Sequence, residues 1–263
     1  MSFDIPKKIS PAVSVENITK LYGKENNNII RTSLNASTFN QTNLNSKKCN
    51  QQADSSVTQT TQNSKPTIKR KRVNGGGISL IKGQKWNING NNGKIPAKIN
   101  ICLGWDSDNS DFEIDASAFM LAQNGKVTDD SWFIFYGQKK SPDNNIIYKS
   151  NNENPKLPDD AEFKINLINI SRNIQKIIIC LTIYEAFERN LDFSMTKNLY
   201  ARITDENGTE LAIYRTDSLS SDVTSLVVGE LYRYKDSWKF CAVGSGFRRD
   251  LAGFCNIYGV ELE

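Results

Sequence analysis

A succession of short runs rich in β-branched and aromatic residues, separated by turn residues, fills the chain from Ile78 onward. The runs are ISLIKG, AKINICLGW, FEIDASAFMLA, WFIFYG, EFKINLINI, KIIICLTIYEA, LYARITD, TELAIYRTD, SLVVGELYRY and SWKFCAVGSG. Such runs are typical of strands, and the Asn124–Gly125 and Asn207–Gly208 pairs between them are typical of tight hairpins. The pattern predicts an all-β fold, an antiparallel β-sandwich of about 190 residues. One short C-terminal helix is expected over RRDLAGFCNIYG.

The residues before this β-rich part have a different composition. Between residues 25 and 64, Asn, Gln, Ser and Thr occupy 26 of 40 positions. Such a segment buries too little apolar surface to offset the entropy lost on ordering. A short helix is expected over Ser14–Gly23, between an N-cap serine and a C-cap glycine. The sequence therefore predicts a mostly disordered basic tail over residues 1–75 and a folded domain over residues 76–263.

Charge divides the chain at the same place. Residues 1–75 contain 12 Lys and Arg against 4 Asp and Glu, whereas residues 76–263 contain 21 against 25. The basic excess is confined to the tail, which argues against the whole chain being a nucleic-acid-binding protein. The basic segment Lys65–Arg72 could contact nucleic acid or anionic lipid, or it could be a solubilising linker. It contains no aromatic residue for base stacking.

The chain has no histidine, and its five cysteines form no CxxC pair. This excludes Ser-His and Cys-His catalysis and histidine-liganded metal sites. Cys102, Cys180 and Cys241 lie within strand-like runs, where a small buried hydrophobic residue is expected. Scattered cysteines, the lack of an apolar stretch of about 20 residues and the lack of a secretory signal predict a soluble cytoplasmic protein.

The stretch LGWDSDNSDFEIDASAF, residues 103–119, places five acidic residues within ten positions. They are Asp106, Asp108, Asp111, Glu113 and Asp115. If FEIDASAFML is a strand, residues 111, 113 and 115 share one face, while Phe112 and Ile114 share the other. Like charges placed in this way repel each other, and no Lys or Arg occurs from residue 103 to residue 123 to neutralise them.

A divalent cation would remove this repulsion. Calcium is held by carboxylate, amide and carbonyl oxygens, which Asp, Asn and Ser supply, whereas zinc and copper sites use His or Cys. An EF-hand does not fit, because a loop starting at Asp106 would have Asp111 in place of its glycine and Ser117 in place of its last glutamate. Two alternatives remain: a solvated acidic face, or a carboxylate-based hydrolase that uses Asp111 and Asp115 as acid and base.

The motifs GWD, DFEIDASAFML, WFIFYG, KSPD and GELYRYKDSWKFCAVGSGF resemble the TerD family of tellurium-resistance and stress-response proteins. The resemblance runs from Ile78 to Val260. It implies a β-sandwich that binds calcium at acidic loops, has no attached enzymatic activity and works in membrane-associated multiprotein stress complexes. We therefore expect a calcium-binding or scaffold module that is not an enzyme and that is cytoplasmic, peripheral to the membrane.

The resemblance, together with the acids of the loop before EFKINL, implies a set of calcium ligands. They are Asp106, Asp111, Glu113, Asp115, Asp143, Asn151 and Asp160. Asn151 stands where the family has an aspartate, and Asn144 stands where it has a glycine. Because a neutral ligand holds calcium less strongly, we expect one or two ions, with the second site weakened or lost. Without a metal, the domain would be a plain interaction module with a basic arm.

Overall fold

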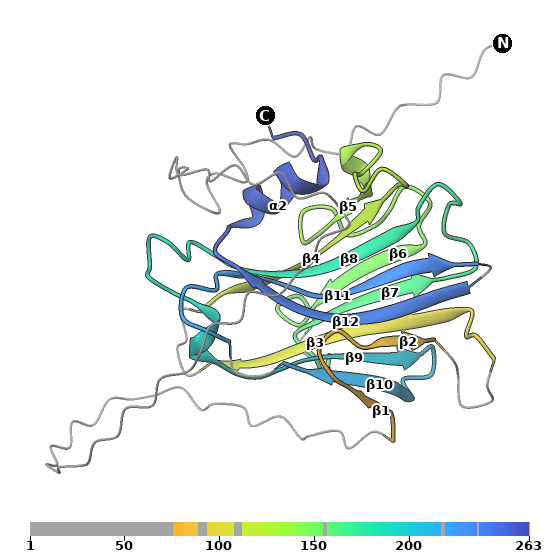
Figure 1. Ribbon diagram of the computed structural model, residues 1–263, viewed down its shortest axis with the longest axis horizontal. Coiled ribbons are helices and arrows are strands. Elements are labelled where there is room, and N and C mark those ends of the chain that lie inside the picture. The colour runs from red at the N-terminus through yellow and green to blue at the C-terminus, as the bar shows by residue number, and fades with distance from the viewer. Residues whose placement is uncertain are drawn as a thin grey trace, which may run out of the picture. The chain divides into compact units, whose positions relative to one another are not determined.

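The computed structural model describes residues 76–88, 94–107, 112–154, 157–216, 219–235 and 237–262. The predicted tail, with its expected helix at Ser14–Gly23 and its basic segment Lys65–Arg72, lies outside these residues. The described part is built from two six-stranded sheets and one α-helix close to its C-terminal end (Figure 1). The predicted all-β sandwich with a short C-terminal helix is confirmed.

The first sheet, called sheet A, has β9 and β3 at its centre. Its order is β1 (Ile78–Leu80), β10 (Glu210–Arg215), β9 (Thr196–Asp205), β3 (Lys98–Ser107), β7 (Ala161–Asn166) and β6 (Ile146–Ser150). Strand β1 runs parallel to β10, and the other neighbouring strands of sheet A are antiparallel. The predicted hairpin at Asn207–Gly208 joins β9 to β10, and there Asp205 N donates to Thr209 O at 3.0 Å.

The second sheet, called sheet B, has β11 and β8 at its centre. Its order is β2 (Lys85–Asn87), β12 (Ser237–Phe247), β11 (Ser225–Tyr234), β8 (Lys176–Ile183), β4 (Ile114–Leu121) and β5 (Phe133–Ile134). The predicted strand WFIFYG is reduced to the two residues of β5. A 3₁₀ turn, η1 (Asp130–Trp132), takes the preceding residues, because the Asp129 carboxylate accepts a hydrogen bond from Ser131 N at 2.9 Å.

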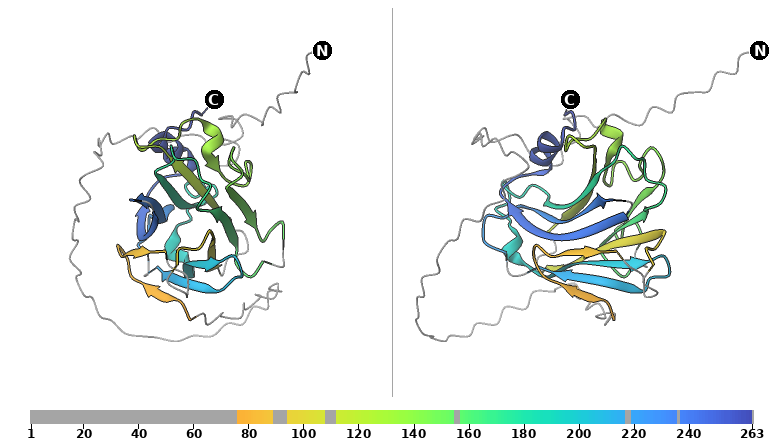
Figure 2. Two further views of the ribbon diagram at one scale, coloured as in Figure 1. Left: turned by 90° about the vertical axis from the view of Figure 1, so that its right-hand side faces the viewer. Right: turned by 45° about the vertical axis from the view of Figure 1, so that its right-hand side comes forward.

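The two sheets stack face to face, as the two views of Figure 2 show. Apolar side chains from both sheets form a shared core between them. Strand β3 illustrates the period of two that the sequence predicts. Ile99, Ile101 and Leu103 are fully buried between the sheets, while Asn100 and Cys102 lie on the outer face of sheet A. Each fully buried aliphatic side chain of this kind contributes about 1.5–3 kcal/mol to stability.

Helix α2 (Leu251–Tyr258) packs on the outer face of sheet B and closes a second apolar cluster (Figure 1). Its boundaries follow from local sequence. Asp250 Oδ1 accepts a hydrogen bond from Gly253 N at 2.8 Å, and Gly259 ends the helix in the left-handed conformation, with φ 79°. Phe254 is buried and meets Phe119 of β4 edge-on.

Four cysteines fall within the described residues, and all four are buried and free of disulfides. They are Cys102, Cys180, Cys241 and Cys255. The predicted burial of the first three is confirmed. In the part of the chain that the structure describes, no helix is long and apolar enough to cross a membrane.

The antiparallel order brings several acidic residues to one end of the sandwich, among them Asp106, Asp115 and Asp160. We call this the acidic end. There β3, β6 and β8 finish and β4, β7 and β9 begin. The two sheets are joined at this end through η2 (Phe193–Met195), the short turn on the left of Figure 1. Phe193 N donates to Val223 O at 2.8 Å, just before β11 starts.

Candidate metal centre

The start of β4 has the alternation that the sequence predicts. Phe112 is buried and Ile114 is partly buried, and both pack against the core between the sheets. Glu113 is exposed and Asp115 is half-buried, on the other side of the strand. Asp111 lies outside the described residues. The apolar residues of this stretch therefore anchor the chain, while its described acids line the acidic end.

Asp106, Asn151 and Asp160 lie at the same end of sheet A, where β3 finishes and β7 begins. The Asp160 carboxylate accepts a hydrogen bond from Trp105 N at 3.0 Å, which holds it beside the backbone that leads into Asp106. Asn151 N donates to Asp160 O at 2.9 Å, so the turn after β6 is joined to the same point. Asp106 itself is exposed, and its Oδ2 accepts a hydrogen bond from Asn198 Nδ2 at 2.6 Å.

Asp115 lies beside a group of hydroxyl side chains. Burial, followed by the nearby charge of Asp115, raises the pKa of the Tyr136 and Tyr148 phenols. In the register of β4 and β8, Asp115 stands opposite Thr182, and Ser117 follows two residues later on the same face. Among the described residues, Ser117 Oγ and Thr182 Oγ1 are buried without a hydrogen-bond partner. These two hydroxyl oxygens therefore accept no hydrogen bond from the described part of the chain.

Asp143 does not join this group. It precedes β6, whereas Asn151 follows it, so the two residues lie at opposite ends of that strand. Burial would raise the pKa of Asp143, but hydrogen bonds from Ser141, Asn145 and Ser171 hold it below its usual value. Its Oδ1 accepts from Ser141 Oγ at 2.6 Å, and its Oδ2 accepts from Ser171 N at 3.2 Å. Asp143 therefore stabilises a turn, and we leave it out of the candidate centre.

The described residues supply the right kind of ligand for a hard cation, but not a complete shell. Asp106, Asn151 and Asp160 offer oxygen only, which suits calcium and magnesium better than zinc or copper. Among the residues that the structure describes, no three Asp, Glu or Cys side chains converge closely enough to hold a metal ion. Any metal here would need a further ligand, and Asp111 belongs to the segment 108–111, which directly follows β3.

A buried ion pair beside this centre was not predicted from the sequence. The Asp159 carboxylate accepts hydrogen bonds from Arg202 Nε at 2.9 Å and from Arg202 Nη2 at 2.6 Å, and a third from the Tyr200 hydroxyl at 2.7 Å. These bonds raise the pKa of the Arg202 guanidinium, so the arginine stays charged. The only sequence signal was the alternation of Tyr200, Arg202 and Thr204 along a strand-like run, which does not reveal a partner.

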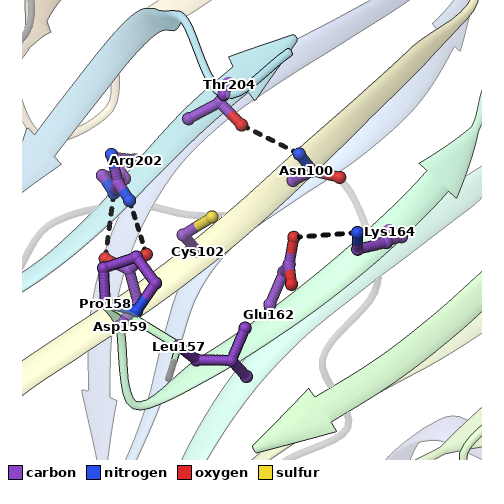
Figure 3. Close-up of a pocket in the computed structure, with 10 residues that line it drawn as sticks. Asn100, Cys102, Leu157, Pro158, Asp159, Glu162, Lys164, Arg202 and Thr204 are labelled. Atoms are coloured by element: carbon purple, nitrogen blue, oxygen red, sulfur yellow. Dashed lines mark hydrogen bonds and ion pairs between the residues drawn. The ribbon is translucent and has the colours of Figure 1, made fainter. Parts of the chain in front are cut away.

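The pair lies in a hollow of about 240 Å³ on the outer face of sheet A (Figure 3). The residues that line it are Asn100, Cys102, Leu157, Pro158, Asp159, Glu162, Lys164, Arg202, Thr204 and Gly208. Burial, followed by the charge of Asp159, raises the pKa of the Cys102 thiol, so this cysteine stays protonated and unreactive. Asp115, the one described member of the postulated acid–base pair, does not line this hollow.

Glu210 of β10 carries a buried carboxylate oxygen, Oε2, that has no hydrogen-bond partner in the described part of the chain. Burial raises its pKa, although Arg202 and Arg215 act in the opposite direction. A raised pKa means that ionisation costs stability in the folded state, so the cost appears as pH rises above about 4.5, the ordinary value of a glutamate. We expect Glu210→Gln to stabilise the protein by about 1 kcal/mol at pH 7 and to have no effect at pH 4. Urea unfolding at both pH values checks this, and equal effects at both would contradict it.

The sequence of the β-rich domain is similar to that of known proteins. The model of the TerD domain matches residues 77–258. The chain belongs to the TerD family. It is 38% identical over 196 residues to "Tellurium resistance protein TerD" of Alcaligenes sp, a match that covers 72% of this chain and 96% of that protein. This TerD-family protein is also 35% identical over 191 residues to "General stress protein 16U" of Bacillus subtilis (strain 168), which covers 70% and 98% of the two chains.

A third relative covers a smaller part of the TerD domain. "Chemical-damaging agent resistance protein B" of Clostridium acetobutylicum is 37% identical over 138 residues, which is 52% of this chain and 99% of that protein. The names of the three relatives describe resistance and stress proteins, and none of them names an enzymatic reaction. The family predicted from the motifs is confirmed, and with it the class of tellurium-resistance and stress-response proteins.

Proposed function

We propose that this protein is a calcium-binding stress-response module, which acts as a binding or scaffold component in resistance to tellurite or other toxic agents and is not an enzyme. The observation that carries the proposal is that hydrogen bonds at the acidic end hold Asp160 beside Asn151 and beside Trp105, the residue that precedes Asp106. The oxygen atoms of Asp106, Asn151 and Asp160 come from two separate segments of sheet A. A cation would therefore join the end of β3 to the β6–β7 connection.

The proposed centre holds one ion. Asp106 and Asp160 supply carboxylates, Asn151 supplies a neutral oxygen, and Asp111 and Asp115 complete the set from the chain that enters β4. Calcium bound there neutralises the acidic end and links its loops. We infer no second ion at Asp143, because hydrogen bonds from its own turn occupy that carboxylate.

The scaffold role follows from the change that calcium would cause. Without calcium, the carboxylates of the acidic end repel one another and any acidic partner. With calcium, the same surface is less negative and its loops are held together, which favours docking of a partner protein. Capture of bound proteins from cells that make this chain, with calcium or with a chelator, tests this role. A set of partners that is the same under both conditions would contradict it.

Calorimetric titration of calcium, and then of magnesium, into the full chain tests the metal proposal. We expect the wild-type chain to bind calcium and the Asp106→Asn/Asp160→Asn variant to lose at least tenfold in affinity, because two charged ligands become neutral. Asp143→Asn is the matched control, since it removes one carboxylate at the opposite end of β6 and should leave the affinity unchanged. No heat of binding by the wild-type chain at millimolar calcium would refute the proposal.

A further inference from the structure

We propose that Arg202 is a positioning residue for the cation centre: through Asp159 it fixes the carboxylate of Asp160 beside the end of β3. The inference rests on the proposed calcium site and adds a residue that neither the motifs nor the acidic cluster indicates. Arg202 itself makes no contact with a cation in this proposal. Its role is to determine where a neighbouring ligand points.

Asp159 and Asp160 are consecutive residues whose side chains have different partners. The carboxylate of Asp159 accepts from Arg202 and Tyr200 on the outer face of sheet A. The carboxylate of Asp160 accepts from Trp105 N. Because one peptide joins the two residues, holding the Asp159 side chain restrains the backbone from which the Asp160 side chain extends toward Trp105 N.

The backbone around Asp160 carries this restraint into the rest of the centre. Asp160 N donates to Leu103 O at 2.9 Å, and Asp160 O accepts from Asn151 N at 2.9 Å. One residue is therefore bonded to β3 on one side and to the turn after β6 on the other. If Asp160 shifts, two proposed ligands, Asp160 and Asn151, shift with it.

Arg202 is suited to this role because it is held firmly. It lies on β9, directly opposite Cys102 of β3 in the centre of sheet A, and the residue as a whole is 8% exposed. Two of its nitrogens meet the two oxygens of Asp159, a forked contact that sets orientation as well as distance (Figure 3). A lysine would offer a point charge without that orientation.

The contribution of the pair to stability does not explain its presence. Two charges removed from water lose about as much in hydration as they gain by attraction, and apolar residues of the same volume often stabilise a protein equally well. What apolar residues cannot do is fix the direction of the Asp159 side chain. This difference separates a positioning role from an ordinary packing role.

Calcium affinity and thermal stability of the Asp159→Leu/Arg202→Met variant test the inference. The variant removes one charge of each sign, so the net charge stays the same. We expect its thermal midpoint to stay within a few degrees of wild type, whereas its calcium affinity falls about 10–100-fold, as for other residues that orient metal ligands. Lys98→Gln/Glu206→Gln is the matched control, because it removes an exposed pair, 3.8 Å apart, at the opposite end of β3, and it should bind like wild type.

A second variant and a second measurement separate a loss of orientation from a loss of charge. Arg202→Lys retains the charge but not the fork, and we expect it to bind calcium less tightly than wild type and more tightly than the double variant. Terbium luminescence sensitised through Trp105, measured as the part of the signal that Trp105→Phe removes, reports how close the ion lies to β3, and it should weaken in both variants. Wild-type binding with unchanged affinity in both variants would overturn the positioning role alone. No binding by the wild-type chain would overturn the calcium site and, with it, this inference.

Discussion

Replacing Asp159 by alanine is expected to lower the free energy of unfolding by about 3–5 kcal/mol. Its side chain and that of Arg202 are 5% and 10% exposed, so the guanidinium would be left in the protein without its counter-ion. Tyr200 would lose the acceptor of its hydroxyl at the same time. This loss of stability should exceed the contribution of any exposed ion pair to the free energy of unfolding, which is at most about 1 kcal/mol.

Urea unfolding followed by circular dichroism measures this change, and a thermal midpoint lowered by about 10 °C is expected with it. The control is Glu206→Ala, which breaks the pair with Lys98 where both side chains are more than half exposed. A loss for Asp159→Ala that is no larger than the loss for Glu206→Ala would show that water reaches Arg202. Because the double variant with Arg202→Met removes both charges, it should recover most of the lost stability.

The fold was predictable because its signals are local. The alternation of Ile99, Ile101 and Leu103 with polar or small residues indicates a strand with one buried face, and the structure buries all three. Asp250 and Gly259 mark the two ends of α2 for the same reason, since each acts on backbone groups within a few residues. The prediction was wrong where a nearby side chain favours another local structure. The Asp129 carboxylate caps a 3₁₀ turn, and this turn takes the first residue of the predicted strand WFIFYG.

The candidate centre was predictable only in part, because it depends on which loops share an end of the sandwich. Asp106 and Asp160 are far apart in sequence but lie at the same end of sheet A, because β3 and β7 are antiparallel neighbours. The motif that includes Asp143 gives no sign that its turn lies at the other end of β6. The hydrogen bonds between Asp159 and Arg202 could not be predicted from the sequence either, because they depend on which strands lie next to each other in sheet A.

The described acids are compensated in different ways, which makes the proposed cation easier to locate. Asp159 has a buried arginine, and Asp143 has hydroxyl and backbone donors. Asp160 accepts a hydrogen bond from the backbone N–H of Trp105, and Asp106 accepts one from the side-chain amide of Asn198. Both hydrogen bonds come from uncharged donors, so Asp106 and Asp160 are the residues at which to test the proposed cation first.

Gly104→Ala is expected to destabilise the protein by about 3 kcal/mol, although the change adds a single carbon atom. A Cβ at this position would lie 2.3 Å from Cζ and 2.4 Å from the hydroxyl oxygen of Tyr200. The ring cannot move away freely, because its hydroxyl donates to Asp159. Gly104 is the glycine of the GWD motif, and its small size lets Tyr200 cross β3 and reach the ion pair.

A double-mutant cycle with Tyr200→Ala tests this explanation. Once the ring is absent, the added methyl group has space, so Gly104→Ala should cost much less in the Tyr200→Ala background than in wild type. Gly76→Ala is the control, because nothing lies within 4 Å of a Cβ built there. Equal costs in both backgrounds would mean that the backbone conformation, and not contact with Tyr200, requires a glycine at this position. If the cycle gives the expected coupling, the glycine of the motif maintains the Tyr200–Asp159–Arg202 network, a role separate from the one proposed for its aspartate, Asp106.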